Sequence, residues 1–311
     1  MGTNQIRIHE VGLRDGLQME ARVVPTESKI RWATALAASG VEILQLGSFV
    51  HPERVPQMAD TDSLVRRFRA GSPTGRPVLS GLVLNQKGLD RALETGVDLV
   101  CMGVSASETH SLKNTRMTGD QALELTLAMG RRAMEANRRV QVSIQSAFGC
   151  GYEGSVAEER VIRIAERYLS AGLTDISLAD TAGHADPRGV RSLFRAIRRL
   201  SPEIEPACHF HDTYGLGLAN CVAAWEEGVG GFEASFGGLG GCPFTAVAGG
   251  NVCTEDLAHL FGRMGLAVGL DLSGLIALSR EASEFFGRDL PGSIYKTGPI
   301  RWPPDGSAVG D

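Results

Sequence analysis

The chain has 311 residues, 43% of them hydrophobic, and a formal net charge of −5 at pH 7. That length fits one large α/β domain or two small ones, and the hydrophobic content supports a sizeable core, so disorder is not the expected state. The negative net charge argues against a nucleic-acid partner and against binding to an anionic membrane surface.

Short apolar runs rich in β-branched residues alternate along the chain with longer helical patterns. The runs predict eight strands, at residues 6–11, 41–46, 78–83, 99–103, 140–145, 175–178, 206–210 and 231–235. Helices are predicted between the strands, among them 26–38, 120–136, 156–171 and 187–200. Strands that alternate with helices predict parallel βα units.

Eight βα units at this length predict an α/β protein with a closed (β/α)8 TIM barrel, a fold of about 250 residues. The alternative is a doubly wound open sheet, but no Gly-x-Gly-x-x-Gly turn follows the first strand. We expect residues 1–270 to form the catalytic barrel. Residues 271–311 would add a C-terminal helix at 272–286 and a proline-rich irregular tail, as part of the same domain.

Residue types at the helix ends support these boundaries. Thr26 is the predicted N-cap of the first helix, and Gly40 is the predicted glycine just past its end. Gly172 would end a later helix in the same way. Gly96 and Gly228 each lie just before a predicted strand, as expected of glycines at helix C-termini.

The six cysteines contain no CxxC pair, so neither a zinc ribbon nor a thioredoxin-type motif is indicated. No signal-peptide pattern precedes the first predicted strand, and no apolar run is long enough to span a bilayer. We therefore expect a reducing compartment, most simply the cytoplasm, and no membrane partner.

Two histidines, His209 and His211, close the seventh predicted strand. Strand side chains alternate between faces, so both imidazoles should point the same way. With a carboxylate oxygen from Asp15 and an amide oxygen from Asn251 they would form a mixed shell that suits a divalent metal such as Mg²⁺ or Mn²⁺. A hydrogen-bonded polar pair is the alternative for the histidines alone, but the four residues together favour a metal.

Polar residues from separate segments should converge on one rim, because active sites of this fold lie at the carboxyl ends of the strands. In chain order the candidates are Arg14, Asp15, Gln45, Ser48, Gln145, Ser146, Asp180, His209, His211, Cys242 and Asn251. This convergence favours an enzyme over a binding module.

Three of these residues have alternative roles. Arg14 could form a structural salt bridge, or it could stabilise an anionic enolate oxygen beside the metal. Asp180 could cap the next helix, or it could transfer a proton or support a ligand. Cys242 could be a small buried hydrophobe, but its glycine-rich loop favours a mobile lid that carries a reactive thiol.

With these residues assembled, the chain resembles the 3-hydroxy-3-methylglutaryl-CoA lyases, a group of the metal-dependent carbon–carbon lyases and synthases built on TIM barrels. The matching segments are VGLRDGLQ at 11–18, SFV at 48–50, VPQM at 55–58, GCGYEG at 149–154, DT at 180–181, HFHDTYG at 209–215, GGCPF at 240–244, GN at 250–251 and TEDL at 254–257. The segment around Cys242 distinguishes the lyases from the related isopropylmalate and homocitrate synthases.

The resemblance implies a role for each candidate. The implied metal ligands are Asp15, His209, His211 and Asn251. The implied catalytic residues are Arg14 for the enolate, Cys242 for proton movement at the acetyl carbon, and Asp180 and His209 for removal of the hydroxyl proton. Substrate contacts are expected from Arg14, Gln18, Gln45 and Ser48.

The implied reaction is a retro-Claisen cleavage of 3-hydroxy-3-methylglutaryl-CoA to acetyl-CoA and acetoacetate, by a homodimer, in leucine catabolism. Two residues depart from the family pattern: Gln45 stands where a glutamate is common, and Gln141 where an arginine is frequent. A neutral Gln45 cannot act as a base. The alternatives are the same chemistry on a different 3-hydroxyacyl-CoA, an acyl-CoA condensing synthase, or a binding protein without turnover.

Overall fold

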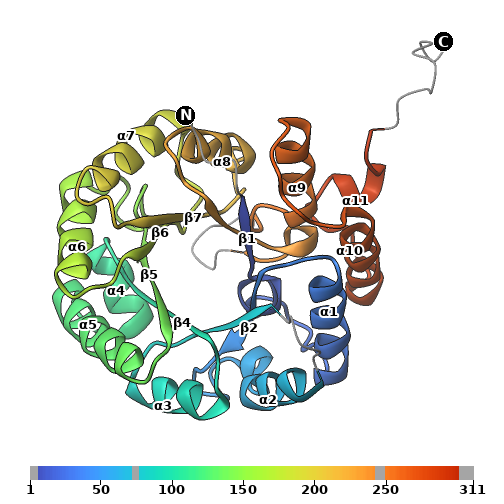
Figure 1. Cartoon of the computed structure of the whole chain (residues 1–311), viewed down its shortest axis with the longest axis horizontal. Helices are drawn as coiled ribbons and strands as arrows, with labels where there is room; N and C mark the ends of the chain where they lie inside the picture. The colour runs from blue at the N-terminus through green and yellow to red at the C-terminus, as the bar shows by residue number, and fades with distance from the viewer. Residues whose placement is uncertain (1–5, 72–76, 242–248, 301–311) are drawn as a thin grey trace.

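The computed structural model describes residues 6–71, 77–241 and 249–300. Eight parallel strands follow one another in chain order and close into a barrel through the pairing of β8 with β1 (Figure 1). The strands are β1 Arg7–Glu10, β2 Ile43–Ser48, β3 Val78–Leu82, β4 Leu99–Ser105, β5 Arg139–Gln145, β6 Asp175–Asp180, β7 Glu205–Phe210 and β8 Gly231–Ala234. The predicted (β/α)8 barrel and its eight predicted strands are confirmed.

Helices surround the barrel on its outer side (Figure 1). They are α1 Thr26–Ala38, α2 Thr61–Gly71, α3 Gln86–Thr95, α4 Glu108–Thr115, α5 Gly119–Glu135, α6 Glu158–Ser170, α7 Pro187–Arg198, α8 Gly217–Glu226, α9 Thr254–Arg263, α10 Leu272–Phe286 and α11 Ile294–Thr297. Three short helical turns complete the order, η1 Gly12–Gly16, η2 Pro56–Met58 and η3 Phe236–Gly238. Within the described ranges, none of the helices combines the length and the apolar character that a bilayer crossing needs.

The predicted C-terminal helix at 272–286 is α10, and it lies beside α1 (Figure 1). The indole of Trp32 on α1 meets the ring of Phe285 edge-on, with ring centroids 5.5 Å apart. Its Nε1 donates a hydrogen bond to Glu281 Oε1 at 2.9 Å. A buried tryptophan whose N–H is paired is a strong anchor, so this contact attaches α10 to the outer layer of the barrel.

The first helix has its predicted bounds, but its N-cap differs from the prediction. Thr26 is the first residue of α1, and the N-cap position belongs to Pro25. The Thr26 hydroxyl donates instead to Asp60 Oδ2 at 2.7 Å, before α2, so the predicted N-cap role is wrong. The predicted glycine at the other end is confirmed, because Gly40 has a φ of +87°, which side chains other than glycine rarely adopt.

Three strands extend two residues beyond their predicted ends. β2 continues to Ser48, β4 to Ser105 and β6 to Asp180. All three extra segments stay in the ladder, where Ser48 pairs with Leu82, Ser105 with Gln145 and Asp180 with Phe210. Asp180 is therefore the last residue of β6 rather than part of the following loop.

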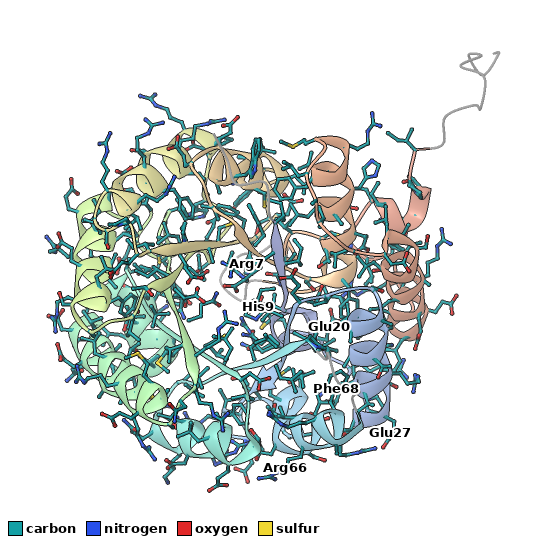
Figure 2. The ribbon with its side chains drawn as sticks, in the orientation of Figure 1. Arg7, His9, Glu20, Glu27, Arg66 and Phe68 are labelled. Carbon is teal, nitrogen blue, oxygen red and sulfur yellow. The ribbon has the colours of Figure 1, made fainter. Side chains whose placement is uncertain are left out.

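Polar side chains line much of the barrel interior. His9 of β1 and Glu233 of β8 lie in register, as do Gln141 of β5 and Asp175 of β6. Figure 2 shows Arg7 and His9 directed into the centre of the barrel. The main apolar core lies instead between the outer faces of the strands and the helices. The interior therefore brings titratable groups beneath the rim where the strands end.

Candidate metal centre and active site

Asp15, His209 and His211 form a compact cluster at the carboxyl ends of β1 and β7. One ligand atom from each lies within 4.8 Å of the others. Asp15 Oδ2 is 3.5 Å from His211 Nε2 and 4.0 Å from His209 Nε2. Both imidazoles face the carboxylate, as expected for residues two apart on a strand. A carboxylate with two imidazole nitrogens is a donor set that binds divalent cations.

Asn251, the fourth predicted ligand, joins this cluster from the segment after β8. Its Nδ2 donates to Asp15 Oδ2 and to the carbonyl of Leu239, both at 2.9 Å. Its Oδ1 is buried, and no residue of the described ranges donates a hydrogen bond to it. A buried acceptor left without a partner is costly. The free oxygen beside a carboxylate and two imidazoles therefore fits a divalent cation.

The backbone around Asn251 requires glycine at two positions. A Cβ on Gly250 would lie 1.8 Å from the carbonyl oxygen of Gly238. Gly240 has a φ of +127°, which an L side chain rarely adopts. Asp212 N also donates to Gly250 O at 2.8 Å, just past β7. These described glycines therefore hold Asn251 next to the end of the His-x-His strand.

Arg14 lies between Asp15 and Gln45. Its Nη1 donates to Asp15 Oδ1, and its Nε donates to Gln45 Oε1. Burial alone would raise the pKa of Asp15, but the charge of Arg14 and the nearby His211 hold that pKa well below its usual range. The carboxylate is therefore ionised, as a metal ligand must be. The salt bridge considered for Arg14 is present in the structure.

A cavity of about 490 Å³ opens over the cluster. Seven of the predicted site residues line it: Arg14, Asp15, Gln18, Ser48, Gln145, His209 and His211. This volume falls within the usual range for small-molecule sites. Gly241 is also part of the wall, whereas Cys242 and the rest of segment 242–248 lie outside the described residues.

Gln45 lies behind Arg14, not in the wall of the cavity. It is 1% exposed, and its side-chain oxygen accepts from Arg14 Nε, so it orients the guanidinium. Gln141, the other departure from the family pattern, lies deeper in the barrel and donates to Asp175 Oδ1 at 3.1 Å. Any influence of these two glutamines on the substrate would therefore be indirect.

Asp180 is fully buried, and its carboxylate serves the loop after β6. It accepts from the backbone amides of His184 at 2.8 Å and Ala185 at 3.0 Å. Burial raises its pKa above the usual value, although these two bonds oppose the shift. The N-cap of the next helix, α7, is Asp186, so the helix-cap alternative for Asp180 is wrong. Its role in proton transfer stays a prediction.

Glu233 belongs to the site although the sequence interpretation did not include it. Its Oε2 is 3.1 Å from His209 Nδ1, and its Oε1 accepts from the Ser177 hydroxyl at 2.8 Å. Burial alone would raise the pKa of Glu233, but the bond to His209 and the charges of His209, His9 and Arg14 lower it to about 2. The alternation of side chains along β8 could have placed Glu233 inside the barrel. Its contact with His209 could not be predicted without knowing the register between β7 and β8.

Glu10 connects the separate segments that carry the cluster. Its Oε1 accepts from the amide of Gly12 at 2.7 Å and from the amide of Phe236 at 3.1 Å. Its Oε2 accepts from the Thr254 hydroxyl at 2.5 Å. One buried side chain thus joins the η1 turn that carries Asp15 to the segments on both sides of Asn251. Burial raises its pKa to about 8.

We expect Glu10 to make the protein less stable as the pH rises from about 4.5 to about 8. Within this window the folded state holds a proton on Glu10 that the unfolded state has lost, so the free energy of unfolding falls with pH. Glu10→Gln mimics the protonated carboxyl and should flatten this decline. Urea unfolding between pH 5 and 9 measures it, with the exposed Glu94→Gln as control. An unchanged decline in Glu10→Gln would contradict the assignment.

A closed (β/α)8 barrel with a carboxylate and two imidazoles at the carboxyl ends of its strands is the architecture of a barrel enzyme with a candidate metal centre. The HMGL-like family model matches residues 5–281. The chain belongs to the HMGL-like family, and it is a carbon–carbon lyase.

Individual relatives agree with this assignment. Hydroxymethylglutaryl-CoA lyase YngG of Bacillus subtilis is 36% identical over 287 residues, covering 92% of this chain and 95% of the relative. An (R)-citramalyl-CoA lyase of Chloroflexus aurantiacus is 38% identical over 305 residues, covering 95% of each. The structure of an HMG-CoA lyase from Acenitobacter baumannii with coenzyme A and 3-methylmalate superposes with a TM-score of 0.89 at 37% identity, covering 95% of this chain and 96% of that one.

Proposed function

We propose that the chain cleaves 3-hydroxy-3-methylglutaryl-CoA to acetyl-CoA and acetoacetate and that it uses Mg²⁺ or Mn²⁺. The main support is the position of Arg14 beside the Asp15, His209 and His211 cluster on the wall of one cavity. Relatives named for this reaction, and one solved with coenzyme A, add to that support. Asn251 is proposed as the fourth ligand, and Gln18 and Ser48 as substrate contacts on the cavity wall.

In the proposed reaction the C2–C3 bond of the substrate breaks. The 3-hydroxyl loses its proton, C3 becomes the ketone carbonyl of acetoacetate, and the bonding electrons pass to C2 to give the enolate of the thioester. A divalent cation, when bound, would polarise the oxygens of the substrate and lower the pKa of the hydroxyl. Arg14 donates hydrogen bonds to the enolate oxygen as charge develops there. For removal of the hydroxyl proton, predicted for His209 and Asp180, Asp180 is the proposed group, because a cation ligated by His209 would occupy the free nitrogen of that imidazole.

Cys242 is proposed to return a proton to C2, directly or through a water that it orients, which completes acetyl-CoA. We therefore expect Cys242→Ala to lower kcat strongly while the bound metal content stays unchanged. Steady-state kinetics and metal analysis of the same preparation check this. An equal loss of turnover and metal would contradict a role in proton transfer.

The second candidate substrate is citramalyl-CoA, which the same bond cleavage would convert to acetyl-CoA and pyruvate. Two observations favour testing it: the 38% identity to a lyase named for this substrate, and the neutral Gln45 behind Arg14.

To test the function, purified protein is incubated with each thioester and Mg²⁺ or Mn²⁺, with and without chelator, and products are identified by mass spectrometry. Acetoacetate that forms with metal but not with chelator would establish the first proposal. If only citramalyl-CoA is cleaved, giving pyruvate, the second proposal would replace the first. Absence of both products, with metal shown to be bound, would contradict both.

Three finer proposals follow from the family resemblance. They are that the protein works in the cytoplasm, that it is a homodimer, and that its reaction belongs to leucine catabolism. Light scattering on the eluting protein tests the dimer, since a monomer mass would contradict it.

A further inference from the structure

We propose that Glu233 is a positioning residue for His209: it holds the proton of the neutral imidazole on Nδ1 and aims Nε2 at Asp15. This deepens the proposed function, because it concerns a predicted ligand of the same metal centre. The inference starts from the 3.1 Å separation between Glu233 Oε2 and His209 Nδ1. A carboxylate can only accept a hydrogen bond, so the nitrogen that it meets must carry the hydrogen.

The second ring nitrogen of His209 then has a free lone pair. It faces the cluster, where Nε2 lies 4.0 Å from Asp15 Oδ2. A histidine ligates a metal through an unprotonated nitrogen, and a partner on the other nitrogen fixes its tautomer and ring orientation. The Nδ1–H tautomer is therefore the one that makes His209 competent as a ligand.

Glu233 is itself held rigidly. The hydroxyl of Ser177 donates to its Oε1 at 2.8 Å, so each carboxylate oxygen has a described partner. His209 and Glu233 are also in register on β7 and β8, which fixes their side chains side by side. Both are largely buried, at 7% and 8% exposure. Water therefore competes weakly with this hydrogen bond.

The neighbouring histidine inside the barrel makes a different contact. His9 is in register with Glu233 on the other side, but its Nε2 lies 2.7 Å from Ser80 Oγ. Ser80 can donate or accept, so this contact does not fix the tautomer of His9. His9 thus serves as an internal comparison within the same interior.

The tautomer can be observed in the metal-free protein without substrate. Long-range ¹H–¹⁵N correlation spectra of ¹⁵N-histidine-labelled protein distinguish the two ring nitrogens, and the His209→Asn variant assigns the signals. We expect Nδ1–H for His209 in the wild type and in Ser177→Ala. Glu233→Gln keeps an acceptor oxygen and should retain this tautomer. Glu233→Leu keeps a similar volume without an acceptor and should lose it.

A second readout is the affinity for Mn²⁺, measured from the free-ion electron paramagnetic resonance signal. Loss of the partner of a ligand histidine costs about 10- to 100-fold in metal affinity. We therefore expect Glu233→Leu to bind Mn²⁺ more weakly by about this factor, and Glu233→Gln to lose less affinity. At a pH at which His209 is neutral, a wild-type imidazole protonated on Nε2 alone, or an unchanged tautomer in Glu233→Leu, would overturn the proposal. The wild-type spectrum decides even if Glu233→Leu fails to fold. Because no substrate is used, failure to cleave a thioester would not affect this result.

Discussion

Asp15→Asn will abolish catalysis at ordinary metal concentrations, because it removes the one negative charge among the four predicted ligands. The two side chains have nearly the same shape, so the change tests charge rather than volume. Removing a partner of a metal ligand already costs about 10- to 100-fold in affinity. We therefore expect loss of the ligand charge itself to weaken Mn²⁺ binding by at least about 100-fold.

Metal titration followed by kinetics at each metal concentration measures this effect, and activity should recover partly at high metal. Asp212→Asn is the matched control, because Asp212 follows His211 in the chain but its Oδ1 accepts from Gly217 N at 2.6 Å, at the start of α8. An asparagine can make the same bond. Equal losses of Mn²⁺ affinity in the two variants would show that Asp15 acts through the overall negative charge near the site and not as a metal ligand.

The barrel was predictable from the sequence because its evidence is local and repeated. Each βα unit shows a change from strand to helix pattern, and eight repeats at this length lead to closure. The predictions were wrong at some element ends, where the local residue types do not indicate the structure that forms. The strand pattern fades at Ser105 and Asp180, yet both stay in the ladder with the next strand. At Thr26, a favourable N-cap residue type is used to bind Asp60 instead.

The site was predictable to the extent that it follows from strand ends. Asp15, His209, His211 and Asn251 meet because the carboxyl ends of parallel strands share one rim. Glu233 escaped prediction because its partner, His209, is 24 residues away and is set by register.

Burial gives two of the predicted residues partners that the sequence did not indicate. Gln45 accepts from Arg14, and Asp180 accepts from backbone amides, while the role of Asp180 in proton transfer stays a prediction. Such partners depend on three-dimensional packing, which strand and helix patterns do not contain.

Arg14→Lys will lower kcat by about 10²- to 10³-fold while changing KM little, the cost typical of losing one preorganised donor to a developing oxyanion. Arginine has five N–H donors in a planar fork. In the structure the fork reaches Asp15 and Gln45 at once and also lines the cavity. A lysine ammonium keeps the charge but cannot hold both partners and still present a donor at the same place.

Gln45→Ala separates orientation from charge in this prediction. It removes the acceptor of Arg14 Nε but leaves the guanidinium and its contact with Asp15. We expect a smaller fall in kcat than for Arg14→Lys, because the donor to the substrate remains, though less well fixed. Mn²⁺ affinity is measured for both variants, because a variant that displaces the metal ligand Asp15 would bind Mn²⁺ more weakly. If Arg14→Lys retained more than a tenth of wild-type kcat with metal bound, the enolate would have to be stabilised by another group on the cavity wall.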